Sequence, residues 1–129
     1  MENKAKKIKS FTDLNAWKEG HKLVLMVYRE TKTFPKEERF SLTDQIRRAV
    51  VSVTSNVAEG FSRNSSKEKA KFFNTAIASL TEVQNQLLIA RDLAYFTKEK
   101  FNQIAGQTVI VNKLLTGLVK SAKLMNDRV

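Results

Sequence analysis

The C-terminal quarter of the chain carries apolar or small side chains at alternating steps of three and four residues. The positions are Phe101, Ile104, Thr108, Val111, Leu115, Leu118, Ala122 and Met125. This spacing, sustained over roughly three and a half heptads, places them on one face of an α-helix and is typical of bundle packing at shallow crossing angles. Because one helix cannot bury such a face by itself, the rest of the chain must supply helical neighbours.

Three further segments show helical spacing. The first begins at Thr12 as N-cap, ends before Pro35, and carries Leu14, Trp17, His21, Val24 or Leu25, and Tyr28. The second runs from a capping box at Ser41 and Asp44 to Gly60, a left-handed stop, with apolar residues at 42, 46, 49, 53 and 57. The third follows a capping box at Ser65 and Glu68, with Phe73, Ala76, Leu80, Val83, Leu87, Ala90 and Ala94 in line.

Turn residues are scarce, with four glycines and one proline in 129 residues. A sheet protein of this length needs many turns, so the composition favours a few long helices. We therefore predict an all-α fold: a basic, flexible N-terminal arm over residues 1–10, and a single four-helix domain over residues 11–129.

The second and third segments are apolar beyond a single stripe. The additional residues are Val50, Val51, Val57, Phe72, Ile77, Leu88 and Leu93. An apolar surface wider than one neighbouring helix covers predicts burial on a second side, most simply against another copy of the chain.

The residues that several classes of function require are missing from the sequence. The chain has no cysteine, which fits a reducing cytosol, and no apolar run near the roughly 20 residues that span a bilayer. The single histidine, His21, is not preceded by the glutamate that a di-iron bundle requires. No pair of groups is typical of acid–base catalysis, so we expect a cytoplasmic protein that is not an enzyme and has no metal or cofactor. Trp17 and Tyr28 lie at core spacing and are interpreted as packing residues.

Polar residues form a stripe on the second and third segments. It comprises Gln45, Arg48, Ser52, Asn56, Glu59, Thr75, Ser79, Glu82 and Gln86. One interpretation is a buried polar site; the other is a structural hydrogen-bonded network that fixes helix register, with Glu59 or Glu82 paired to Arg48 or Arg63. The structural interpretation is preferred for Gln45, Arg48, Ser52, Asn56, Glu59, Ser79 and Glu82.

Positive charge dominates the surface residues, with a formal net charge of +10. Beyond the arm, with Lys4, Lys6, Lys7 and Lys9, the candidate contacts are Arg63, Lys67, Lys69, Lys71, Lys113, Lys120 and Lys123, followed by Arg128. Since no base-reading motif surrounds them, they predict phosphate contacts to nucleic acid that depend on salt and ignore sequence. The alternative is an acidic protein partner.

The stretches "QIRRA" and "NVAEGFSR", with the pattern of Phe73, Ala76, Ser79, Leu80 and Glu82, resemble a known family. It comprises the small four-helix-bundle proteins encoded in intervening sequences of bacterial 23S rRNA genes. Ala78 departs from the glycine that is usual there. The resemblance implies an antiparallel up-and-down bundle that assembles as a homopentamer, without a catalytic residue.

Related bundles serve as accessory proteins of diversity-generating retroelements, in which a basic pentamer binds a reverse transcriptase and its template RNA. The expected function is therefore binding of nucleic acid, RNA in preference to DNA, by a non-enzymatic oligomer. The alternative is a protein–protein scaffold or accessory subunit that docks an acidic partner such as a reverse transcriptase.

Overall fold

The computed structural model describes the backbone of residues 7–127 and the side chains of residues 7–124. The expectations for Lys4, Lys6, Met125 and Arg128 therefore lie outside the described side chains. The elements are η1 (Phe11–Asp13), α1 (Asn15–Thr31), η2 (Lys36–Glu38), α2 (Leu42–Ser62), α3 (Ser66–Asp92) and α4 (Lys98–Asp127), where η denotes a 3₁₀ helix. No strand occurs among the described residues, and the all-α prediction is confirmed.

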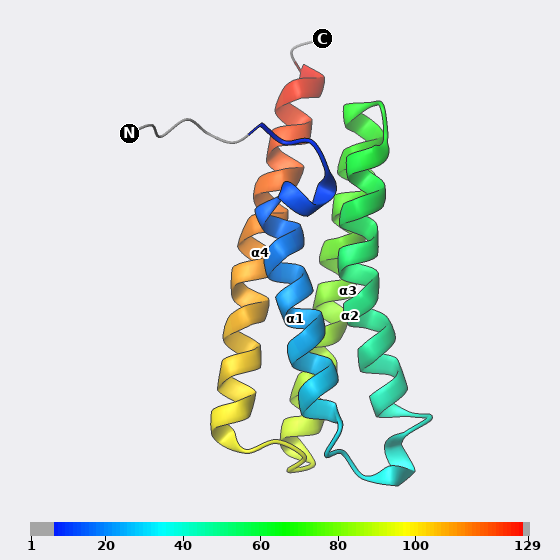
Figure 1. Cartoon of the computed structure of the whole chain (residues 1–129), viewed down its shortest axis with the longest axis vertical. Coiled ribbons are helices and arrows are strands. Elements are labelled where there is room, and N and C mark those ends of the chain that lie inside the picture. The colour runs from blue at the N-terminus through cyan, green and yellow to red at the C-terminus, as the bar shows by residue number, and fades with distance from the viewer. Residues whose placement is uncertain (1–6, 128–129) are drawn as a thin grey trace.

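The four α-helices run alternately up and down, and each packs against its two neighbours around the bundle (Figure 1). The most extensive contacts join α2 to α3 and α3 to α4. The α2–α3 connection lies at the same end of the bundle as the C-terminal end of α4. The α1–α2 and α3–α4 connections lie at the opposite end (Figure 1).

The core follows the predicted stripes of α2, α3 and α4 closely. Its fully buried large residues are Leu23, Val27, Ile46, Val50, Val53, Val57, Leu80, Val83, Leu87, Ile104, Val111 and Leu115. Each such side chain contributes roughly 1.5–3 kcal/mol relative to exposure in water. Burial of these four apolar stripes against one another is therefore what holds the helices together.

The predicted stripe of α1 was wrong at His21, Leu25 and Tyr28, whereas Leu14, Trp17 and Val24 pack against the core. Leu23 and Val27 are buried, whereas His21, Leu25 and Tyr28 are exposed and Trp17 is half-buried. The face that turns inward also carries Ala16 and Gly20, and a Cβ on Gly20 would lie 3.1 Å from a methyl carbon of Thr54. The inward face of α1 therefore combines apolar side chains, Leu23 and Val27, with small residues that let α1 approach α2 closely.

The helix starts agree with prediction at two of three places, the N-cap positions Ser41 and Ser65. Ser65 caps α3 by accepting a hydrogen bond from the N–H of Glu68 at 3.1 Å. Ser10, not Thr12, caps the first helical segment, because Ser10 and Asp13 exchange the reciprocal bonds of a capping box around η1. Ser41 stands at the N-cap of α2 but makes no side-chain capping bond.

The expected left-handed stop at Gly60 was also wrong, since α2 continues in helical geometry to Ser62. Gly60 is buried, and an added Cβ would lie 2.6 Å from Cε1 of Phe73. The glycine therefore serves close packing of Phe73 against α2. The end of α2 is closed instead by Lys69, whose Nζ donates to the carbonyl of Phe61 at 2.6 Å.

Helix α3 ends at Asp92, two residues before the last position of its predicted stripe, Ala94. Ala94 adopts a left-handed conformation (φ 61°) and is exposed. The turn directs Tyr95 and Phe96 onto the buried ring of Phe34, with centroid distances of 5.2 and 5.1 Å. A small aromatic cluster thus joins the two connections at this end of the bundle.

Replacing Gly60 with alanine tests the close contact with Phe73. The new methyl overlaps a buried ring, so we expect a loss of about 1–3 kcal/mol in the free energy of unfolding, measured by urea denaturation. Gly117 of α4 is the matched control, because nothing lies within 4 Å of its added Cβ. Gly117→Ala is expected to stabilise by about 0.5–1 kcal/mol through helix propensity. Equal effects of the two substitutions would contradict the packing role of Gly60.

Tyr95 gives the stability a pH dependence. Its hydroxyl donates to Glu38 at 2.7 Å, and this bond, with burial and the charges of Glu38 and Glu37, raises the pKa of Tyr95 above 10.0. A pKa raised on folding contributes stability that is complete below the unfolded value and is lost as pH rises through the folded value. We expect the unfolding free energy to fall above pH 10, and Tyr95→Phe to reduce that fall in thermal scans.

Candidate nucleic-acid interface

The α2–α3 connection holds four of the predicted phosphate contacts, and two of them are engaged within the chain. The guanidinium of Arg63 lies 4.5 Å from the ring centroid of Phe72 and 3.3 Å from Glu59. Its Nε is buried without a hydrogen-bond partner. Lys69 donates to the carbonyls of Gly60 and Phe61. Arg63 and Lys69 therefore stabilise this turn. The Glu59–Arg63 ion pair is one of the pairs expected from the sequence.

Lys67 and Lys71 are different. Both side chains are exposed on the first turns of α3, and neither forms an ion pair with any residue that the structure describes. Their ammonium groups are thus available to an external anion. At this turn, Lys67 and Lys71 are the stronger candidates for phosphate contact.

The predicted lysines of α4 are Lys113, Lys120 and Lys123, and all are exposed and unpaired among residues 7–124. Lys120 and Lys123 lie near the C-terminal end of α4, at the end of the bundle that also carries the α2–α3 connection (Figure 1). Lys113 lies about 15 Å before Lys123 along the helix at 1.5 Å per residue. The fold therefore collects Lys67, Lys71, Lys120 and Lys123 at one end.

The predicted N-terminal arm is partly described. Lys7 and Lys9 are exposed, and the backbone N–H groups of Lys9 and Ser10 donate to Asp13 at 2.9 and 3.1 Å. These bonds attach the last residues of the arm to η1. Residues 1–6 lie outside the description.

The polar stripe separates into local groups rather than one network. Ser52 of α2 and Ser79 of α3 share a hydrogen bond of 2.8 Å, and Asn56 donates to both the carbonyl and the hydroxyl of Ser52. Ser79 is buried and is the member that crosses between helices. This group matches the structural interpretation, in which polar contacts set the register of α2 against α3.

The other members of the stripe bond within their own helix. Arg48 pairs with Asp44 at 3.0 Å, and Glu82 accepts from Gln86 at 3.5 Å. Gln45 and Thr75 are exposed. Exposed ion pairs of this kind contribute about 0–1 kcal/mol, so they do not determine the arrangement of the helices.

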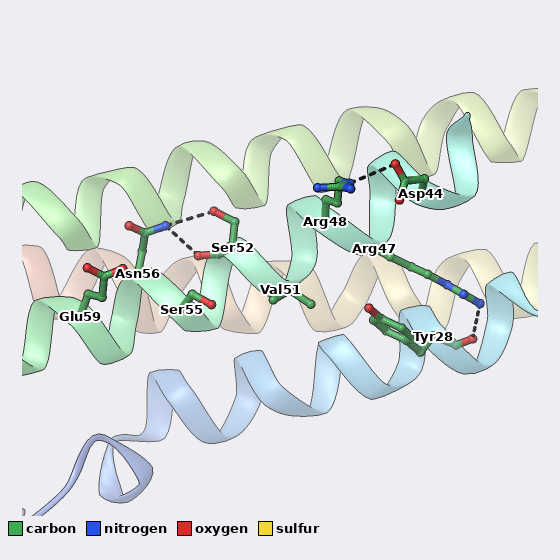
Figure 2. A pocket seen from close by; sticks show the side chains of 9 residues that line it. All are labelled: Tyr28, Asp44, Arg47, Arg48, Val51, Ser52, Ser55, Asn56 and Glu59. Carbon is green, nitrogen blue, oxygen red and sulfur yellow. Dashed lines mark hydrogen bonds and ion pairs between the residues drawn. The ribbon is translucent and has the colours of Figure 1, made fainter. Parts of the chain in front are cut away.

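An open groove of about 700 Å³ runs along the outer side of α2 (Figure 2). Its lining is Tyr28, Asp44, Arg47, Arg48, Val51, Ser52, Ser55, Asn56 and Glu59. Tyr28, interpreted from the sequence as a packing residue, is an exposed wall of this groove with the guanidinium of Arg47 over its ring at 4.7 Å. The lining carries two cations and two carboxylates, so the groove has no strong preference for either sign of charge.

Two polar contacts between helices were not predicted from the sequence. Gln107 is buried on α4 and donates to the backbone and side-chain oxygens of Glu19 on α1, both at 2.9 Å. Gln84 of α3 donates to Thr108 of α4 at 3.1 Å. The sequence signal for these contacts is a polar residue inside or beside an apolar stripe, as at Gln107 and Thr108, because such a residue is buried and needs a hydrogen-bond partner. Each contact satisfies a group that would be costly to bury alone.

Within the part of the chain that the structure describes, no three His, Asp or Glu side chains gather as a metal site. His21 is exposed and stacks on Trp17 at a centroid distance of 4.6 Å. Among the described residues, no helix has the length and hydropathy to cross a membrane.

The Ser52–Ser79 contact predicts a measurable coupling. In a double-mutant cycle, Ser52→Ala and Ser79→Ala are each expected to destabilise by about 0.5–1.5 kcal/mol. The loss in the double variant should be smaller than the sum of the two single losses, because both substitutions remove the same Ser52–Ser79 bond. Ser55→Ala on the exposed face of α2 is the control and should change little. Strictly additive losses from Ser52→Ala and Ser79→Ala in urea unfolding would show that the bond contributes nothing.

Comparison with known proteins gives a match at the level of family. The family model described as 23S rRNA-intervening sequence protein matches residues 12–117. A search of curated proteins gives no match.

Among solved structures, the bundle is similar to the crystal structure of a protein from Bacteroides thetaiotaomicron. That protein is described as having unknown function and as a member of the S23 ribosomal protein family. The TM-score is 0.75 at 22% identity, over 81% of this chain and 95% of the other, which supports the fold alone. The family match, spanning most of the residues that form the four helices, carries the assignment: the chain belongs to the 23S rRNA-intervening sequence protein family.

Proposed function

We propose that this protein is a non-enzymatic RNA-binding bundle that contacts phosphates through lysines at the α2–α3 end. The observation that carries the proposal is the placement of Lys67, Lys71, Lys120 and Lys123. They lie at one end of the bundle, exposed and without ion-pair partners among the described residues, in a chain of net charge +10. Family membership favours RNA over DNA.

The mode of contact follows from the side chains. A lysine ammonium is a flexible point charge with three donors, suited to phosphate oxygens but not to bidentate reading of a base edge. Binding by such groups releases counterions and falls steeply with salt. The proposed interface therefore recognises the charge of the RNA backbone. The proposal includes a cytoplasmic location.

Self-association is part of the proposal. Val50 and Val57, expected at a subunit contact, are buried within one chain, but Val51, Leu88 and Leu93 remain 38–51% exposed. Further exposed apolar residues are Leu25, Val109, Ile110 and Leu124. Exposed apolar side chains in this number support assembly, and the family resemblance supports a homopentamer, which would present five copies of the basic end to one RNA.

A protein partner is the second candidate. The groove along α2 combines cations, carboxylates and Val51, a lining that suits a protein surface better than a phosphate backbone. On this alternative the bundle is an accessory subunit that docks an acidic enzyme such as a reverse transcriptase.

The salt dependence of RNA binding tests the proposal. Anisotropy of a labelled RNA hairpin is measured at several salt concentrations for the wild type, for Lys67→Ala/Lys71→Ala and for Lys120→Ala/Lys123→Ala. The slope of log K against log salt is negative. Each double variant is expected to make it less negative by about 1.4–1.8, because two lysine–phosphate contacts are lost. Lys69 is left intact because it closes α2.

The control is Lys18→Ala/Lys22→Ala, which removes the same charge from exposed positions on α1. Sedimentation velocity on each variant establishes that the assembly is unchanged and gives the number of subunits. Absence of binding at low salt, or equal loss in the control, contradicts the proposal and leaves the protein-partner candidate.

A further inference from the structure

We propose a second nucleic-acid site at the opposite end of the bundle, where a basic pocket takes one phosphate of single-stranded RNA and Phe40 stacks on the neighbouring base. This inference deepens the proposed function and rests on it. The site lies at the α1–α2 connection, at the other end of the bundle from the lysines described above (Figure 1). Sequence analysis assigned no function to these residues.

The pocket has an unbalanced charge. It encloses about 280 Å³, and its lining is Thr31, Lys32, Phe34, Pro35, Lys36, Arg39, Thr43 and Arg47. Four of these residues are cations and none is a carboxylate. No ion pair involves any of the four among the residues described. A concave surface with four uncompensated positive charges concentrates anions.

The neighbouring carboxylates are directed elsewhere. Glu30 faces Lys100 at 3.4 Å and Arg29 at 3.6 Å, and Glu38 accepts from Tyr95 and from the backbone of Leu42. Glu37 is exposed and does not line the pocket. The positive potential of the pocket is therefore not cancelled from within.

Arg47 is held in place before any ligand binds. Its Nε donates to Thr31 at 2.9 Å, one terminal nitrogen donates to the carbonyl of Tyr28 at 3.4 Å, and its plane lies over the ring of Tyr28. A guanidinium has five N–H donors, so these bonds leave others for a phosphate. Because the guanidinium of Arg47 is already held in position, less conformational entropy is lost when a ligand binds.

Phe40 supplies the second part of the site. Phe40 is 86% exposed, although burial of its ring would contribute about 1.5–3 kcal/mol, and it directly follows Arg39, which lines the pocket. The guanidinium of Arg39 lies 5.3 Å from the centre of the ring. A single exposed apolar residue carries no meaning alone, but an aromatic ring joined to a cationic pocket is the combination by which proteins hold single strands.

The ligand chemistry follows from this juxtaposition. A phosphodiester pairs with Lys36, Arg39 and Arg47, and the base beside it stacks on Phe40. A duplex keeps its bases paired and stacked on each other, so the ring gains nothing from it. The site therefore selects a single-stranded segment, whereas the α2–α3 end contacts phosphates of either form.

The test measures anisotropy of a labelled ten-nucleotide single-stranded RNA and of a blunt-ended RNA duplex against Phe40→Ala, Phe40→Leu and Phe40→Trp. Loss of one base stack corresponds to about a 5- to 150-fold weakening. We expect this weakening for the single strand in the alanine and leucine variants, and wild-type affinity in the tryptophan variant. The salt slope of the Phe40 variants should stay unchanged because no charge is removed, and the affinity for the RNA duplex should be unaltered.

The cations are tested by Lys36→Ala/Arg39→Ala. This double variant should make the slope of log K against log salt for the single strand less negative by about 1.4. Arg47 is kept, since it also contacts Thr31. Ile89→Ala is the control for removal of an exposed apolar side chain, because Ile89 is 42% exposed on α3 and is not among the residues named above for assembly. It should leave affinity unchanged.

Several outcomes overturn the inference and are distinguishable from failure of the proposed function. Wild-type affinity in Phe40→Ala, with weakened binding in Lys67→Ala/Lys71→Ala, removes this site and keeps the proposed function. A change in sedimentation of Phe40→Ala, without a change in RNA affinity, makes Phe40 a subunit contact. Phe40-dependent binding to phosphatidylserine vesicles, with RNA binding unaffected, makes the surface a membrane contact. No RNA binding by the wild type overturns both proposals.

Discussion

The structure depends on the packing of α2 against α3, the most closely joined pair in the bundle. Val53 and Val57 of α2 and Ala76 and Leu80 of α3 are buried to 0–1% exposure, and the contact is closest where Phe73 lies against Gly60. Burial of these faces is non-directional, so it brings the helices together without fixing their register. The buried Ser52–Ser79 bond and the lack of space for a Cβ at Gly60 add that specificity.

The same packing decides which charges are free. Closing the α2–α3 connection engages Lys69 with the last carbonyls of α2 and Arg63 with Phe72 and Glu59. Lys67 and Lys71, on the same short segment, point away from these contacts and remain exposed. A cluster of four cations in the sequence is thus two structural and two available groups. The division has two causes: Lys69 reaches the orphan carbonyls at the end of α2, and Arg63 reaches the ring of Phe72 and the carboxylate of Glu59.

The two ends of the bundle differ in the chemistry that they offer. The end with the α2–α3 connection presents flexible lysines on helices, suited to phosphate contact without preference for strandedness. The end with the α1–α2 connection presents a pocket with a fixed Arg47 beside the exposed ring of Phe40. Under the two proposals, a long RNA that reached both ends would be held at two separated points of a rigid bundle, and self-association would multiply the effect.

The sequence by itself determined the all-α class and the inward faces of α2, α3 and α4, because these depend on local periodicity. It also determined the cap at Ser65 and the break before Pro35, which depend on backbone chemistry within a few residues. It misplaced the inward face of α1, where Ala16 and Gly20 face the core, and the stop at Gly60, because those depend on how closely a second helix approaches. Only the tertiary structure separated Lys67 from Lys69 and gathered Lys32, Lys36, Arg39 and Arg47 around one pocket. Periodicity describes one helix at a time, whereas a site is a relation in space between elements.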